Sequence, residues 1–281
     1  MKVIREIKKM QELSLRLKRA GKSIGFVPTM GYLHEGHLSL MRQAKLENDV
    51  SIISIFVNPL QFGSKEDLKK YPRDFKRDYR LAKNVGVDVL FFPSNKEMYK
   101  EQFLSEVYVR ELSKILCGES RPEHFKGVTT VVAKLFNIVL PDFAYFGQKD
   151  LQQVRILEQL ARDLNFPLKI KILPIIREPD GLAMSSRNKY LSKEDRQDAA
   201  ILYRSLKEAR HIILTGTRQG SAVISTIKRL ISTIKSAKIE YVEIVDAHNL
   251  RRVDELKGEI AILLAAMIKK VRLIDNIIMS V

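Results

Sequence analysis

In the first half of the chain, short β-branched apolar runs alternate with segments whose apolar residues recur at helical spacing. The run Ser23–Val27 predicts a strand, and Leu38 and Met41 mark a helix over Gly36–Lys45. Val50–Val57 is almost entirely apolar, which is typical of a strand buried on both faces. The order strand, helix, strand predicts a βαβ unit with a right-handed crossover.

The same alternation continues as far as Ile176. The pattern predicts further helices over Lys65–Asn84, Phe125–Val139 and Leu151–Leu164, and further strands over Val87–Phe92, Phe143–Phe146 and Leu168–Ile176. Repeated alternation of this kind indicates an α/β protein with a Rossmann-like, doubly wound parallel sheet.

The pattern changes after Ile176. A polar segment, Arg177–Ser192, predicts a loop, and two long helical stretches follow at Asp195–Leu214 and Arg218–Ser236. Three apolar runs then predict strands, at Tyr241–Val245, Ile260–Ile268 and Leu273–Met279. We therefore expect two domains: 1–176, a Rossmann-like domain, and 177–281, a smaller α+β domain.

Composition narrows the class of protein only slightly. The chain has 281 residues, 45% of them hydrophobic, and a net charge of +16 at pH 7. The basic residues are spread among acidic ones, which is typical of solvated helix faces and gives little support to nucleic-acid binding. The sequence shows no run fit for a signal peptide or a membrane span, so we expect a cytoplasmic protein. Cys117, the single cysteine, is interpreted as a packing residue and not a nucleophile.

Candidate chemistry begins between the first predicted strand and its helix. This loop leaves the carboxyl end of a parallel strand, which is where ligands bind in open sheets. His34 and His37 flank the start of the helix, whose free N–H groups and dipole favour an anion. Gly36 lets a phosphate chain approach the backbone closely.

Two rival motifs fit this loop poorly. The spacing of Gly31 and Gly36 imitates a phosphate-binding P-loop, but His37-Leu38 replaces the required Lys-Ser/Thr pair. The segment His34–His37 is one residue short of the zinc motif H-E-x-x-H, and no third metal ligand is evident.

A strand followed by H-x-G-H at the start of a helix resembles the nucleotidyltransferase superfamily, which includes class I aminoacyl-tRNA synthetases. Met184-Ser185-Ser186-Arg187 is similar to that superfamily's second, K-M-S-K-S-like signature. Several longer blocks resemble the pantothenate synthetase family: Phe26–His37, Phe56–Gly63, Tyr71–Asp74, Phe146–Gln153, Arg177–Ser192 and Arg272–Asn276. Two positions depart from the family pattern, since Glu123 and Lys269 stand where glycine is usual.

The resemblance implies an ATP-dependent ligase that joins pantoate to β-alanine through a pantoyl-adenylate. It implies catalytic roles for His37, His34 and Lys149, with His37 as proton donor, and pantoate binding by Gln61 and Gln153, with Gln61 also meeting β-alanine. The implied ATP-binding residues are Met30, Gly31, Tyr32, Leu33, His34, Glu35, Gly36, His37, Gly147, Gln148, Lys149, Asp150, Ile176, Met184, Ser185, Ser186 and Arg187. Mg²⁺ is expected with ATP, without a dedicated protein site, and the family implies a homodimer whose C-terminal domain closes over the active site.

Three alternatives stay open. Another nucleotidyl-transferring enzyme of this fold, such as a small cytidylyltransferase, lacks the two glutamines and the Arg177–Ser192 block. A tRNA-acting protein would carry an anticodon-binding module and an aromatic-rich basic patch, and neither is evident. A catalytically silent homologue would have lost motif residues, and here they are all present.

Overall fold

A computed structural model describes residues 1–64 and 66–281, which form two compact units. The first comprises Met1–Gly147 and Ile156–Pro174, and the second comprises Gln148–Arg155 and Ile175–Val281. The dividing line therefore crosses one helix, α7 (Leu151–Asp163). The predicted domains 1–176 and 177–281 assign the whole of that helix to the first, and this division stays a prediction.

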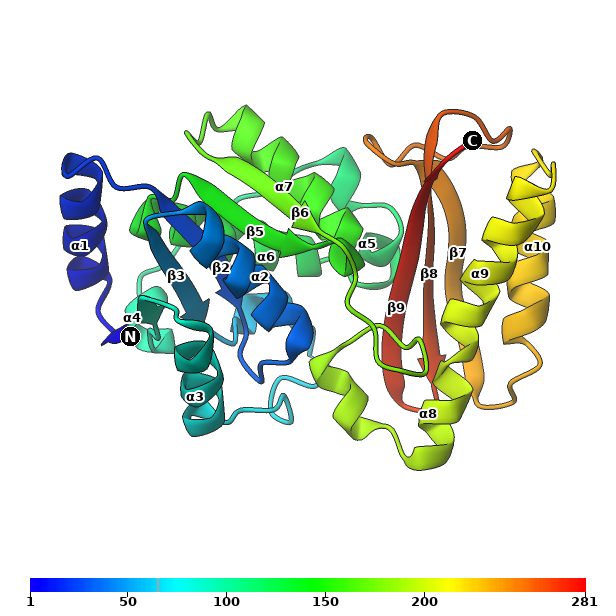
Figure 1. Cartoon of the computed structure of the whole chain (residues 1–281), viewed down its shortest axis with the longest axis horizontal. Helices are drawn as coiled ribbons and strands as arrows, with labels where there is room; N and C mark the ends of the chain where they lie inside the picture. Colours follow the sequence, from blue (N-terminus) through cyan, green and yellow to red (C-terminus); the bar gives the residue numbers. More distant parts are fainter. Residues whose placement is uncertain (65) are drawn as a thin grey trace. The chain divides into compact units, whose positions relative to one another are not determined.

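The first unit is built on a six-stranded parallel sheet in the order β1-β4-β3-β2-β5-β6, of which Figure 1 labels β2, β3, β5 and β6. The strands are β1 (Lys2–Ile4), β2 (Ile24–Thr29), β3 (Val50–Ile55), β4 (Val89–Phe91), β5 (Phe143–Gly147) and β6 (Lys169–Leu173). The chain moves from β2 towards β4 in one direction and continues through β5 and β6 on the other side of β2. This reversal confirms the predicted doubly wound sheet and marks β2 and β5 as its switch point.

Helices cover the sheet and bury its central strands. Packing joins α2 (Glu35–Glu47) to β2, β3, β5 and α3 (Phe75–Val85), whereas α1 (Ile7–Arg19) packs on α6 (His124–Val139). Neighbouring β2 residues point to opposite faces of the sheet, and Phe26 and Val27 are both fully buried. Burial on both faces is the reason that β2 and β3 consist of apolar and small residues throughout.

Several predicted elements in this unit have different limits. The helix predicted over Lys65–Asn84 is wrong at its start: Lys65 lies outside the described residues, and α3 begins only at Phe75. Proline at position 72 disfavours helical backbone at the residue before it, and Asp74 then caps the new helix by accepting from the Arg77 N–H at 3.0 Å. Strand β1, helix α1 and the short helices α4 (Asn95–Met98) and α5 (Cys117–Ser120) were not predicted. Cys117 itself is buried.

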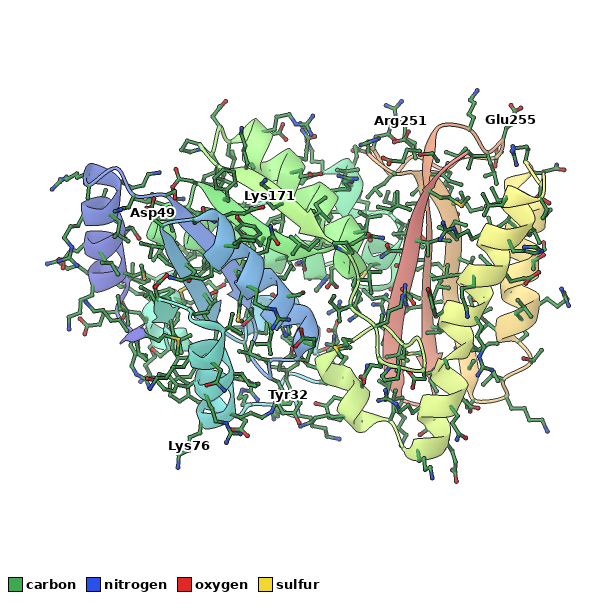
Figure 2. The ribbon with its side chains drawn as sticks, in the orientation of Figure 1. Tyr32, Asp49, Lys76, Lys171, Arg251 and Glu255 are labelled. Carbon is green, nitrogen blue, oxygen red and sulfur yellow. The ribbon has the colours of Figure 1, made fainter. Side chains whose placement is uncertain are left out.

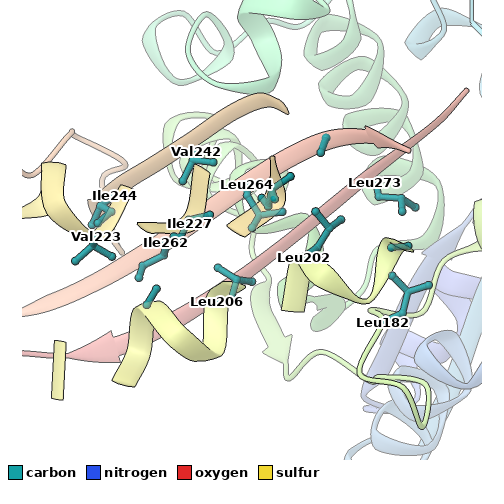
Figure 3. Packing of buried hydrophobic residues seen from close by; sticks show 14 of the residues in the cluster. Leu182, Leu202, Leu206, Val223, Ile227, Val242, Ile244, Ile262, Leu264 and Leu273 are labelled. Carbon is teal, nitrogen blue, oxygen red and sulfur yellow. The ribbon is translucent and has the colours of Figure 1, made fainter. Parts of the chain in front are cut away.

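The second unit packs helices on an antiparallel sheet of order β7-β8-β9. Its strands are β7 (Ala237–Asp246), β8 (Glu259–Ile268) and β9 (Val271–Ser280), at the three predicted positions. Figure 3 shows the core, in which Leu206 of α9 (Ile201–Leu214) and Ile227 of α10 (Gly220–Ile231) pack over Ile244 and Ile262 of the sheet. Charged side chains such as Arg251 and Glu255 project outwards (Figure 2).

Two predicted helices of this unit have different limits. The stretch Asp195–Leu214 is two helices, because Ala200 interrupts it between α8 (Lys193–Ala199) and α9. The stretch Arg218–Ser236 is helical only over α10. At the β8–β9 turn, Lys269 adopts φ +49°, the left-handed conformation that glycine takes without strain. This conformation gives a physical reason for the glycine that the family resemblance implies at this position.

Candidate functional site

The loop between β2 and α2 has a backbone conformation that cannot be predicted from its own sequence. Gly31 and Tyr32 both have positive φ, +82° and +50°. A side chain at Gly31 would place its Cβ 2.9 Å from Ile55 and 3.0 Å from the Asp78 carboxylate, so only glycine fits. The Gly31 N–H donates to the Thr29 hydroxyl at 3.1 Å, and that hydroxyl donates to the Ser54 carbonyl.

A buried carboxylate from α3 fixes the next part of this loop. Asp78 is 1% exposed and accepts from the Tyr32 N–H at 2.7 Å and the Leu33 N–H at 2.8 Å, one bond to each oxygen. Burial raises the pKa of Asp78, although both backbone bonds oppose that shift. This residue was not predicted from the sequence. The available signal was an aspartate on the helix face that also carries Ala82, one turn further along.

The two histidines lie where the sequence predicted, at the amino end of α2. His34 is the N-cap residue, and its carbonyl accepts from the N–H groups of His37 and Leu38. The His34 N–H donates to Nδ1 of His37 at 3.3 Å, and the two rings lie 4.0 Å apart. Since Nδ1 of His37 accepts this bond, the neutral ring carries its proton on Nε2. His37 is therefore arranged as a donor through Nε2.

The segment that follows β3 places Gln61 beside the same loop. Asn58 caps a short 3₁₀ helix, Pro59–Gln61, and Gln61 is buried. Gln61 Nε2 lies 3.1 Å from the Met30 sulfur. A Cβ at Gly127 of α6 would lie 2.2 Å from the Leu60 carbonyl oxygen, so glycine is what lets α6 approach this segment. The structure thus brings together Met30 and Gln61, which come from two different sequence blocks.

A 3₁₀ turn over Gln148–Asp150, directly before α7 and in the second unit, carries Lys149. Both backbone carbonyls of Gln148 and Lys149 accept from the Asn276 side-chain amide at 3.0 Å, and the Gln148 side chain donates to Asn276 at 3.1 Å. Neighbouring Asp275 forms a bidentate ion pair with Arg177, whose Nη1 and Nη2 donate to the two carboxylate oxygens at 2.6 and 2.9 Å. Two adjacent β9 residues therefore hold the Lys149 turn and the start of the Arg177–Ser192 segment.

Burial lowers the pKa of the Lys149 ammonium. Asp150 opposes this shift and the Arg187 guanidinium adds to it. A cation in such surroundings gains from an added negative charge, which a phosphate group would supply.

The segment Arg177–Ser192, predicted as a polar loop, has more structure than expected. Arg177 pairs with Ala183 in an isolated bridge, and a 3₁₀ helix runs over Ser186–Tyr190. The Ser185 hydroxyl caps this helix by accepting from the Arg187 N–H at 3.2 Å. The candidate phosphate-binding residues thus lie on a turn whose base is hydrogen-bonded.

The candidate residues are distributed over both units. The first unit holds Met30, Gly31, Tyr32, Leu33, His34, Glu35, Gly36, His37, Gln61 and Gly147. The second holds Gln148, Lys149, Asp150, Gln153, Ile176, Met184, Ser185, Ser186 and Arg187.

A pocket of about 280 Å³ lies in the first unit beside the β2–α2 loop. Met30, Gly31 and Asp78 line one part of it, and Ile55 and Arg73 contribute elsewhere. Among the described residues, no group of three or more His, Cys, Asp and Glu side chains is arranged to hold a metal ion. Within residues 1–64 and 66–281, no helix has the length and apolar character needed to cross a membrane.

The chain is similar to proteins of known family. The family model described as pantoate–beta-alanine ligase matches residues 2–278. A pantothenate synthetase of Caldicellulosiruptor bescii is 52% identical over 280 residues, which cover 100% of this chain and 99% of that protein.

Solved structures agree with this match. The crystal structure of pantothenate synthetase from Thermus thermophilus has a TM-score of 0.94 at 40% identity and covers 99% of both chains. The pantoate–beta-alanine ligase of Francisella tularensis, complexed with beta-gamma ATP and beta-alanine, has a TM-score of 0.80 at 38% identity, covering 99% of this chain and 97% of that one. With a family model matched from residue 2 to residue 278 and relatives that are aligned end to end, this chain belongs to the pantoate–β-alanine ligase family.

Proposed function

We propose that this chain joins pantoate to β-alanine at the expense of ATP, yielding pantothenate, AMP and pyrophosphate through a pantoyl-adenylate. The observation that carries this proposal is the pair of imidazoles, His34 and His37, at the amino end of α2 in a member of this ligase family. A helix amino terminus with two nitrogen donors suits a phosphate chain.

In the first step, the pantoate carboxylate attacks the α-phosphorus of ATP. A new P–O bond forms, the bond between the α- and β-phosphates breaks, and pyrophosphate leaves. Such a step depends on positioning and on stabilising negative charge. His34 and His37 would donate to phosphate oxygens, with His37 acting through Nε2 as proton donor. Lys149 would neutralise charge near the α-phosphate.

In the second step, the β-alanine amine attacks the acyl carbon of the adenylate, loses a proton and displaces AMP. Gln61 and Gln153 would hold pantoate, and Gln61 would also meet β-alanine. The nucleotide would contact the β2–α2 loop, the 147–150 turn, Ile176 and residues 184–187. Ser185, Ser186 and Arg187 would bind the triphosphate, and the C-terminal domain would close over the site to keep water from the adenylate.

Three finer assignments belong to the same proposal. Mg²⁺ would arrive with ATP, held by phosphate oxygens and water, as is usual for this ion. The chain would act as a homodimer. It would work in the cytoplasm, where its substrates are small soluble molecules.

An isotope-exchange assay tests the two-step scheme. ATP and pantoate alone should support exchange of labelled pyrophosphate into ATP, because the adenylate forms before the amine is needed. Net AMP release should require β-alanine as well. Exchange that depends on β-alanine would contradict the scheme, and AMP release without pantoate would contradict the assigned substrate.

A further inference from the structure

Tyr99, which follows α4, makes a partly buried hydrogen bond that the mechanism above does not use. Its hydroxyl donates to Oδ1 of Asn58 at 2.8 Å. Its ring packs near Phe56 and Phe103, with ring centres 6.0 and 5.0 Å away. Burial raises the pKa of Tyr99, so the phenol keeps its proton, and remains a donor, at any pH at which the protein works.

The Asn58 side-chain amide is held in one orientation by two backbone groups, one a donor and the other an acceptor. Its Oδ1 accepts from the Leu60 backbone N–H at 3.3 Å as well as from Tyr99. Its Nδ2 donates to the Gly127 carbonyl at 3.0 Å. Because a backbone N–H only donates and a carbonyl only accepts, turning this amide over would break bonds on both sides.

That orientation determines how Gln61 is presented. Asn58 Nδ2 also donates to Oε1 of Gln61 at 3.1 Å, so the Gln61 oxygen already has a partner. The other end of this amide, Nε2, lies against the Met30 sulfur, which is a weak acceptor. The oxygen of Gln61 therefore faces Asn58, and its N–H groups face Met30 and whatever binds beside it.

We propose that Tyr99 is a positioning residue that acts through Asn58 to hold the N–H end of Gln61 towards pantoate. The partner of that end would be an oxygen of the substrate, either of its carboxylate or of a hydroxyl. This inference rests on the proposed role of Gln61 in binding pantoate. Without the Tyr99 hydroxyl, Asn58 Oδ1 keeps only the longer bond from the Leu60 N–H. Asn58 is then less firmly oriented, and so is the Gln61 amide that it contacts.

The test compares Tyr99→Phe with the unaltered full-length protein. Phenylalanine keeps the ring and removes only the hydroxyl. The KM for pantoate should rise about three- to ten-fold, the range expected for one hydrogen bond, while the KM for ATP stays within about two-fold. Tyr108→Phe is the matched control, because it removes a hydroxyl from a residue that is 40% exposed, and its kinetics should be unchanged.

Gln61→Glu tests the direction of the amide. Glutamate keeps the shape but replaces the N–H end with a second acceptor, so the KM for pantoate should rise more steeply than in Tyr99→Phe. A Tyr99→Phe protein with an unchanged pantoate KM, or with ATP and pantoate affected equally, would overturn the positioning role. Normal pantoate binding in Gln61→Glu would instead remove Gln61 from the proposed function, and the positioning role with it.

Discussion

At the scale of single residues, a buried charge organises the β2–α2 loop. The two oxygens of Asp78 each take one backbone N–H, from Tyr32 and Leu33, directly before His34. Such a carboxylate loses solvation when it is buried and recovers part of that loss through the two bonds. The result is a loop with two consecutive left-handed residues that leads into the histidine pair.

Asp78→Asn is expected to lower kcat/KM by roughly ten-fold or more. Asparagine keeps the shape, but its NH₂ group would face one of the two backbone N–H groups and leave it without an acceptor, a cost of about 1–3 kcal/mol. Asp74→Asn on the same helix is the control, since asparagine caps helices as well as aspartate does and activity should be retained. Equal activity in both variants would show that the loop does not depend on Asp78.

The raised pKa of Asp78 also predicts that activity and stability respond to acid in opposite directions. A folded-state pKa above the unfolded value means that the folded protein binds this proton more tightly. The contribution of Asp78 to folding stability is therefore fully present at low pH and is lost as pH rises through the raised pKa. The loop, however, needs both ionised oxygens, so kcat/KM should fall as pH drops through that same pKa.

Paired profiles of kcat/KM and of thermal midpoint against pH check this contrast. Asp78→Asn should lack the acid limb of activity that Asp78 causes. An identical acid limb in the variant would assign it to another group.

At the scale of elements, the polar segment Arg177–Ser192 is held at its base by contacts with β9 and α9. Gly181 has φ +92°, and a Cβ there would lie 2.5 Å from the Tyr203 ring. The Arg177 guanidinium stacks 3.7 Å from the centre of that ring and pairs with Asp275. The far end of the segment is held as well, because the Met184 N–H donates to the Ile176 carbonyl at 3.0 Å and the Asn188 side chain donates to the Ala183 carbonyl at 3.2 Å.

Gly181→Ala is expected to disturb this segment and to lower kcat/KM on the order of ten-fold, which corresponds to about 1.4 kcal/mol. Alanine adds both backbone strain and contact with Tyr203. Gly258→Ala is the matched control: Gly258 also has positive φ, at +70°, but open space surrounds it. Only the strain, about 1 kcal/mol, should appear there, as a lower thermal midpoint with normal kinetics. Similar kinetics in the two variants would contradict the role given to the Tyr203 contact.

At the scale of the whole molecule, the net charge of +16 is distributed and partly neutralised. Lys45 pairs with Asp88 at 2.8 Å in the first unit, and Arg177 pairs with Asp275 in the second. Exposed charges of both signs, such as Lys76 and Glu255, project from the surface (Figure 2). This distribution is typical of solvated surfaces and not of a nucleic-acid groove.

Transfer RNA should therefore bind only weakly. In a mobility-shift assay we expect no retardation at about 0.15 M salt, where exposed charges are screened beyond about 8 Å. Binding at lower salt should fall steeply as salt is added, as for non-specific contacts to phosphates. A shift that persists at about 0.15 M salt would favour a tRNA-acting protein, and an adenylation assay on the same sample would then decide between the two functions.

The sequence by itself determined the class of fold and the location of most strands. Runs such as Val50–Ile55 and Ile260–Ile268 are apolar because their strands are buried, and that requirement is local and visible in the pattern. The position of the histidines at a helix start could be predicted for a similar reason, since a strand end, a glycine and a helix start adjoin in the chain. Limits such as the start of α3 at Phe75 were missed because the polar residues before it also suit a helix face.

Only the tertiary structure decided which distant groups meet. Asp78 reaches Tyr32 across 46 positions, and Asn276 reaches Lys149 across 127. The orientation of Gln61 depends on Asn58, which is fixed in turn by Tyr99 and Gly127. Hydrophobic periodicity along the chain indicates which residues are buried. A hydrogen bond between residues far apart in the sequence depends on how whole elements pack. Burial can therefore be predicted from the sequence, whereas the partners of buried polar groups are decided by the three-dimensional fold.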